Sequence, residues 1–99
     1  MHARVSILEG PPDKTDEGLS YFQEEVPPAW ATDPGFKGAI VLNDRQSGRT
    51  LATTFWESEE TMRAMEEDAK RVLSKVAETT GQEIVSVERY EVGLFEVES

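Results

Sequence analysis

Residues 50 to 76, TLATTFWESEETMRAMEEDAKRVLSKV, combine a predicted strand with the longest predicted helix of the chain. The segment from 50 to 56 is rich in β-branched and aromatic residues, which favour a strand. Ser58 can cap the helix that follows and Gly81 suits its C-terminus, so we expect one helix from residue 58 to residue 80. The apolar residues at helical spacing in this helix are Met62, Met65, Ala69, Val72, Leu73 and Val76.

The rest of the chain supplies three more strands and one more helix. Thr15 can cap a helix that reaches Val26, and Pro27-Pro28 is expected to end or kink it. Turn-forming residues at 43 to 48 join two neighbouring strands into an antiparallel hairpin. The order β-α-β-β-α-β predicts an α+β, ferredoxin-like fold, a four-stranded antiparallel sheet with two helices on one face. The four strands are expected at residues 3 to 8, 36 to 42, 50 to 56 and 83 to 92.

The face of the sheet without helices is also predicted to be apolar. Val5 and Ile7 share one face of the first strand, and on the last strand Val85 and Val87 are expected to oppose Ile84. Monomers rarely expose a large apolar sheet face. We therefore expect a homodimer in which two sheets pack against each other.

Composition narrows the class of protein. The 99 residues fit one domain, with a core at about 3 to 93 and a short acidic C-terminal tail. A formal charge of −10 disfavours nucleic acid and anionic membrane surfaces as partners. The sequence has no cysteine, no apolar stretch long enough to span a membrane and no export signal, so we expect a cytoplasmic protein without thiolate chemistry.

Three motifs carry a resemblance to a known family. Residues 34 to 38, PGFKG, the turn 44 to 49, DRQSGR, and residues 55 to 60, FWESEE, at the start of the long helix resemble the antibiotic biosynthesis monooxygenase-like family of the dimeric α/β-barrel superfamily. The resemblance covers about residues 3 to 93. It implies a homodimeric barrel with the helices outside and a ligand cavity between the sheet and the helices of each subunit. Well-known members oxygenate electron-rich aromatic substrates without flavin or metal, and a related subgroup binds and breaks down haem.

The resemblance assigns a site role to one residue, Trp56, which matches the tryptophan that lines the family's cavity and is the candidate catalytic residue. Ala52 and Thr54 are expected on the same strand face, where their small side chains leave space beside the ring. The alternative is that Trp56 only fills the core beneath the long helix, because the large contact area of a buried aromatic side chain is reason enough for its presence.

Two residues that the family's enzymes use have no clear counterpart in this sequence. The oxygenases use an asparagine near the tryptophan, whereas the one asparagine here, Asn43, lies in the predicted hairpin turn. The haem-degrading subgroup needs a histidine on the second helix, whereas the one histidine is His2, expected at a frayed terminus. We therefore expect no haem, no metal site and no other cofactor.

Aromatic side chains are the candidate ligand-binding residues of the cavity. Arg4 and Arg89 are the cations that could orient a ligand there. One hypothesis is a cofactor-independent monooxygenase, an oxidoreductase that acts on a small aromatic or polyketide-like substrate. The alternative is a non-catalytic dimer that binds a hydrophobic ligand or acts in stress, with the aromatic residues serving as core. The candidate ligand-binding residues are Tyr21, Phe22, Trp30, Phe36 and Tyr90.

Overall fold

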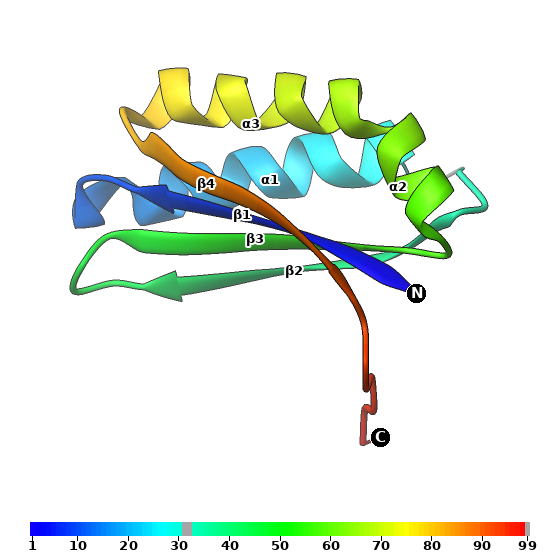
Figure 1. The fold of residues 1–99 in the computed structure, drawn as a ribbon. Coiled ribbons are helices and arrows are strands. Elements are labelled where there is room, and N and C mark those ends of the chain that lie inside the picture. Colours follow the sequence, from blue (N-terminus) through cyan, green and yellow to red (C-terminus); the bar gives the residue numbers. More distant parts are fainter. Residues whose placement is uncertain (31–32, 99) are drawn as a thin grey trace.

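The computed structural model describes the backbone of residues 1–30 and 33–98, and the side chains of these residues except 25–30. Its four strands form one antiparallel sheet in the order β2-β3-β1-β4, and its long helices cover one face of this sheet (Figure 1). This is the predicted ferredoxin-like fold. The elements are β1 (His2–Glu9), a short 3-10 helix η1 (Pro12–Lys14), α1 (Thr15–Trp30), β2 (Phe36–Asp44), β3 (Arg49–Trp56), α2 (Glu59–Ala64), α3 (Glu66–Thr80) and β4 (Glu83–Glu91).

Helix α1 is longer than the sequence predicts. It continues past Pro27 and Pro28 and ends at Trp30. A proline removes one N–H donor from the helix, but its φ of about −65° is itself helical. Each proline costs the helix the bond to the carbonyl four residues earlier, and the helix ends within one turn of them.

The second predicted helix is instead two helices, α2 and α3, which meet at Met65. Met65 has φ −100° and ψ 11°, outside the helical range, and its N–H bonds to the carbonyl of Arg63. The prediction of one continuous helix is therefore wrong. The break leaves carbonyl groups in the last turn of α2 without helical partners, and the carbonyl of Met62 is one of them.

Helix α2 begins with a reciprocal cap that the sequence predicts in part. Ser58 Oγ accepts a hydrogen bond from the N–H of Thr61 at 3.2 Å, and Thr61 Oγ1 accepts one from the N–H of Ser58 at 3.1 Å. The substitution Ser58→Ala is expected to lower the free energy of unfolding by about 1 kcal/mol, because it removes this cap. Urea unfolding measures the loss, and Ser58→Asp, which retains an acceptor, should recover most of it. Equal stability of Ser58→Ala and the wild type would show that the cap contributes nothing.

The core lies between the sheet and the helices. Leu8, Trp56, Met62 and Val76 are at most 1% exposed. Phe22, Val72 and Leu73 complete the buried cluster. The covered face thus combines the apolar stripe of α3 with inward-facing residues of β1 and β3. None of the helices in the described residues is long and apolar enough to cross a membrane.

An irregularity in β4 changes which of its residues face the helices. Opposite β1, Ser86 pairs with Ile7 and Ile84 pairs with Leu8, so that Val85 is an extra residue in the ladder. Such a bulge shifts the alternation of side chains by one position. Ile84 therefore lies on the same side as Val87, beneath α3, and the prediction that the two residues oppose each other is wrong.

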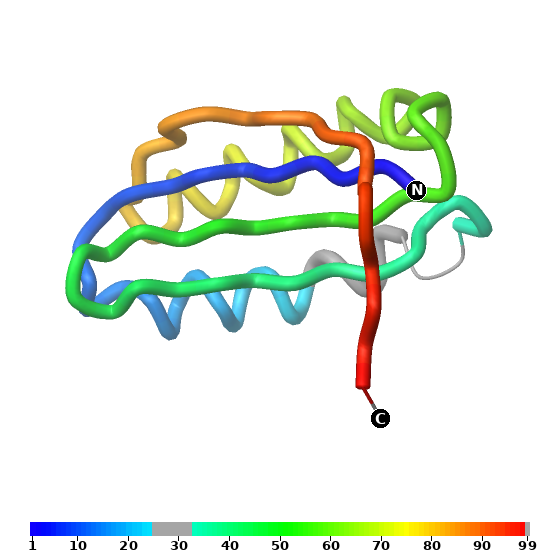
Figure 2. The backbone as a smooth tube through the Cα atoms, turned by 60° about the horizontal axis from the view of Figure 1, so that its bottom comes forward, coloured from blue at the N-terminus to red at the C-terminus, as the bar shows by residue number. Residues whose placement is uncertain are grey.

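The other face of the sheet has no helix over it (Figures 1 and 2). Ile40 is 43% exposed there and Leu42 is 55% exposed. The C-terminal tail leaves the sheet on this side, and the ring of Phe95 packs edge-on against that of Phe55 with centroids 5.3 Å apart. The predicted apolar, helix-free face is therefore present.

Candidate functional site

Two adjoining cavities lie between the sheet and the helices. The smaller has a volume of about 30 Å³ and lies over β1, β2 and β3, beneath α1 and α3. The larger has a volume of about 420 Å³ and lies between α3 and strands β1 and β4. A volume of this size suits a small organic molecule. The residues that line both cavities are Arg4, Ser6, Ala69 and Leu73.

Arg4 is the most unusual group of this site. Its position in β1 turns the side chain toward the helices, where it is 3% exposed. Its Nη2 donates a hydrogen bond of 2.7 Å to the carbonyl of Met62, one of the groups that the helix break leaves free. Its Nε and Nη1 are buried and have no hydrogen-bond partner among the described residues. The guanidinium is thus fixed at one nitrogen and unsatisfied at two.

The charged groups near Arg4 do not neutralise its positive charge. Burial first, and then the nearby positive charges of Arg89 and Arg63, lower the pKa of Arg4 to about 10. Arg89 pairs with Glu66, and Arg63 Nε donates to Glu59 at 3.0 Å. Arg4 is still protonated at neutral pH, because its pKa remains well above 7. It is therefore a buried cation beside two other cations that already have carboxylate partners.

Trp56 lies in the core rather than in the lining of either cavity. Its side chain is fully buried, and its ring meets that of Phe36 edge-on with centroids 5.3 Å apart. Its indole Nε1 donates a hydrogen bond of 3.0 Å to Thr54 Oγ1. Thr54 and Ala52 line the smaller cavity. The structure thus brings together the three residues that the sequence grouped, with Trp56 behind the wall that the other two form.

Of the four predicted ligand-binding residues whose side chains the structure describes, one lines a cavity and one packs on Trp56 in the core. Phe22 lines the smaller cavity, and Phe36 packs on Trp56. Tyr21 packs at the edge of the core and lines a separate depression on the outer surface of α1. The side chain of Trp30 lies outside the described residues.

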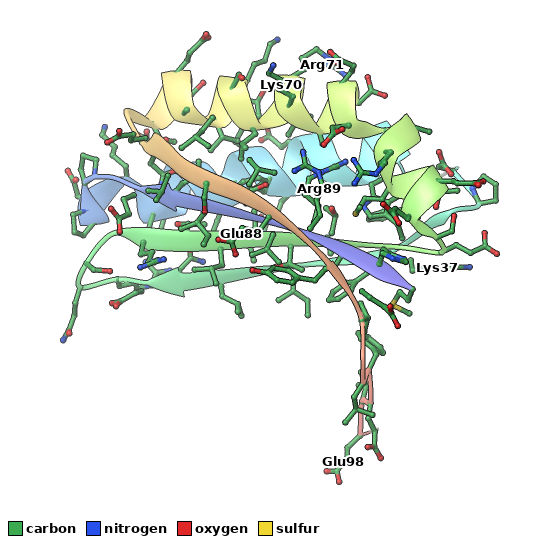
Figure 3. The ribbon with its side chains drawn as sticks, in the orientation of Figure 1. Lys37, Lys70, Arg71, Glu88, Arg89 and Glu98 are labelled. Atoms are coloured by element: carbon green, nitrogen blue, oxygen red, sulfur yellow. The ribbon has the colours of Figure 1, made fainter. Side chains whose placement is uncertain are left out.

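Tyr90, the fifth, is not brought to the cavities. It is 53% exposed on the helix-free face, where its hydroxyl donates a hydrogen bond of 2.5 Å to Glu88 Oε1. This hydrogen bond and the negative charge of Glu88 raise the pKa of Tyr90. Its neighbour Arg89 does line the larger cavity, as Figure 3 shows by its direction from β4 toward α3.

The only histidine of the sequence, expected at a frayed terminus, belongs to the first strand. His2 lies in β1 directly opposite Trp56, rather than in a frayed end. Its Nδ1 is buried without a hydrogen-bond partner among the described residues. The inward direction of His2 could have been predicted, because strand alternation places His2, Arg4 and Ser6 on one face of the strand. Asn43, predicted in the hairpin turn, instead lies near the end of β2 opposite Thr50, where its Oδ1 accepts a hydrogen bond of 3.0 Å from Thr50 Oγ1.

Comparison with sequences finds relatives without an assigned activity. No family model matches the chain. The uncharacterised protein Rv2558 of Mycobacterium tuberculosis is 36% identical over 77 residues, which are 78% of this chain and 33% of that protein. Rv2557 of the same organism is 33% identical over 92 residues, which are 93% of this chain and 41% of that protein. The chain thus spans only about a third to two-fifths of the length of these relatives.

Comparison with solved structures finds the same fold over the whole chain. A candidate antibiotic biosynthesis monooxygenase from Deinococcus radiodurans superposes with a TM-score of 0.73 at 14% identity, with both chains fully covered. The haem degrader MhuD of Mycobacterium tuberculosis, solved with two haems in its active site, has a TM-score of 0.68 at 21% identity over 98% of this chain and all of its own. A dimeric ferredoxin-like protein from an uncultured marine organism has a TM-score of 0.62 at 11% identity, covering 98% of this chain and 93% of that one.

The cavity residues do not fit a haem iron. The described residues that line the two cavities include no histidine, cysteine, methionine or tyrosine, the side chains that ligate haem iron. The likeness to the haem degrader is therefore one of fold. The chain has the ferredoxin-like fold of the antibiotic biosynthesis monooxygenase-like proteins, and the resemblance drawn from its sequence is confirmed at that level.

Proposed function

We propose that this protein is a homodimer that binds a small planar aromatic molecule between its sheet and its helices and oxygenates it without a cofactor. The observation that carries the proposal is the larger cavity, about 420 Å³ in volume, which joins the apolar space in front of Ala52 and Thr54. Apolar residues of this cavity, Ala69, Leu73, Ile84 and Val87, can pack on the body of a planar aromatic or polyketide-like ligand, while the polar residues of the same wall can hold its oxygen groups. In this proposal residues 1–99 form one domain, and the protein is located in the cytoplasm.

The proposed reaction needs no external reductant. A base removes a proton from an activated carbon of the substrate, and the carbanion gives one electron to dioxygen. The resulting radical and superoxide combine to a peroxide anion, which takes the proton back from the base, and the hydroperoxide then loses water to leave a carbonyl group. For a hydroxyanthrone, a CH₂ group and O₂ thus give a C=O group and H₂O, and the substrate supplies all the electrons. The protein contributes a site that excludes water and stabilises negative charge.

The dimer rests on the helix-free face. Ile40 and Leu42 are exposed there together with Val85 and Tyr90. A solved neighbour of the same fold is described as dimeric. Closing two such faces on each other removes the exposed apolar surface from water.

A second function, a ligand-binding dimer without turnover, is favoured by the placement of Asn43. The side chain of Asn43 bonds to Thr50 in the hairpin, so it does not serve as the asparagine that the family's oxygenases use. Both functions predict binding in the same cavity. They differ in whether the bound molecule reacts with dioxygen.

Oxygen consumption with 1,8-dihydroxyanthrone tests the proposal. We expect the wild type to accelerate consumption and to yield the anthraquinone and water. The substitution Ala69→Leu, which adds bulk where the two cavities meet, is expected to lower the rate at least about tenfold, because small displacements of a bound substrate are costly. Ala64→Leu is the matched control, since Ala64 is exposed at the end of α2.

The result separates the two functions. Binding of the anthrone without faster oxygen consumption would reject the oxygenase and leave the ligand-binding dimer. A rate that Ala69→Leu and Ala64→Leu leave equally unchanged, with both variants folded, would place the reaction outside these cavities.

A further inference from the structure

We propose that the ligand of the larger cavity carries an oxyanion, a carboxylate or an ionised hydroxyl group, and that this oxyanion pairs with the guanidinium of Arg4. The inference rests on the proposed function only in taking the same cavity as the binding site. It adds the chemical class of the ligand: a planar apolar body with one negatively charged oxygen group at its edge.

The first argument is the unsatisfied guanidinium. Arg4 is 3% exposed, and only its Nη2 has an acceptor, the carbonyl of Met62. Nε and Nη1 are closed off from solvent and have no partner among the described residues. A buried donor without an acceptor destabilises the fold, and more so when it is charged. A bound oxyanion would supply the missing negative charge and an acceptor for one of these nitrogens.

The second argument is the local charge. The chain has a formal charge of −10, and a buried carboxylate for Arg4 would be easy to supply. Yet Arg63 and Arg89 have carboxylate partners, Glu59 and Glu66, whereas Arg4 has none among the described residues. The fold has left the most buried of the three cations without a counter-ion.

The charges along the wall of the larger cavity also favour a negatively charged ligand. The residues that line the larger cavity carry a net charge of +1, from Arg4, Lys70 and Arg89 against Glu66 and Glu67. A positive lining in a strongly acidic chain favours an anion over a cation at this place. Arg89 and Glu66 have side chains that are 35% and 33% exposed, so this pair can adjust as a ligand enters.

The third argument is that the guanidinium is held in place before any ligand binds. The break at Met65 frees the Met62 carbonyl, and the hydrogen bond to this carbonyl fixes Arg4 at Nη2. The remaining nitrogens have already been removed from water. A site that is desolvated and oriented in advance loses little further free energy when an anion arrives. An apolar residue of similar size would fill the same space without this cost.

Two probes of equal shape test the proposal on the wild type alone. At pH 7, 2-naphthoate is an anion and 2-naphthamide is neutral. We expect isothermal titration calorimetry to give at least tenfold tighter binding of 2-naphthoate. Equal binding of the two probes, or no binding of 2-naphthoate at millimolar concentration, would overturn the proposal.

Two variants locate the anion on Arg4. Arg4→Met is expected to bring the ratio of the two affinities close to one, while the midpoint of thermal unfolding stays the same or rises. Arg71→Met is the matched control, because it also removes one positive charge but lies on the outer side of α3, where Arg71 pairs with Asp68 (Figure 3). Its ratio should equal that of the wild type. A folded Arg4→Met that keeps the wild-type ratio would overturn the proposal.

The outcomes are independent of the oxygenase reaction. A preference for 2-naphthoate that depends on Arg4, together with no oxygen consumption by the anthrone, would support the anion site and reject the oxygenase. Oxygen consumption together with equal binding of both probes would support the oxygenase and reject the anion site.

Discussion

Replacement of Trp56 with alanine is expected to lower the free energy of unfolding by about 3–5 kcal/mol. Trp56 is fully buried between the sheet and the helices, and it packs against Phe36 and bonds to Thr54. Its removal leaves a large void and an unpaired hydroxyl. A loss of this size is a large fraction of the stability of a domain of 99 residues. Urea unfolding followed by circular dichroism measures it.

The milder substitution Trp56→Phe separates a core role from a site role. If Trp56 serves only the core, Trp56→Phe should cost about 1–3 kcal/mol and leave binding of 1,8-dihydroxyanthrone unchanged. If the ring also shapes the cavity through Thr54, binding of the anthrone should weaken as well. A Trp56→Ala variant that loses less than about 1 kcal/mol would contradict the placement of Trp56 in the core.

The fold could be predicted because its signals are local. The cap at Ser58, the alternation in β3 and the turn between β2 and β3 each depend on neighbouring residues. The break at Met65 could not be predicted in this way. Met65 continues the apolar stripe of the helix, and the interruption becomes visible only where Arg4, distant in the sequence, bonds to the Met62 carbonyl.

The site is harder to predict, because residue type alone favours Arg89 and Tyr90 equally as cavity residues. Neighbours on a strand face opposite sides, so only one of the two can point into the cavity. The structure places Arg89 inside and Tyr90 outside. The same rule, applied to β1, groups His2 with Arg4 and identifies an inward-facing polar pair. The lack of an acceptor for Nε and Nη1 of Arg4 among the described residues is a property of three-dimensional packing that no sequence pattern reveals.

The double substitution Ile40→Asp/Leu42→Asp is expected to convert a dimer into a monomer. Both side chains are exposed on the helix-free face of β2, while the alternate residues Ala39 and Val41 line the smaller cavity. In a twofold interface each substitution occurs twice, so four carboxylates would be buried without partners. We expect the dissociation constant to rise at least about a hundredfold, since each unpaired buried charge costs several kcal/mol.

Light scattering at micromolar concentration measures the change, because a monomer has a mass of 11.1 kDa. The matched control is Ser20→Asp/Gln23→Asp, which adds the same two charges at exposed positions of α1. The control should remain a dimer, because a change in net charge alone does not disrupt an apolar interface on the other side of the sheet. A wild type that is monomeric at this concentration would reject the dimer. A dimeric Ile40→Asp/Leu42→Asp variant would show that the copies meet on another surface, and the helix-free face would then need a different partner.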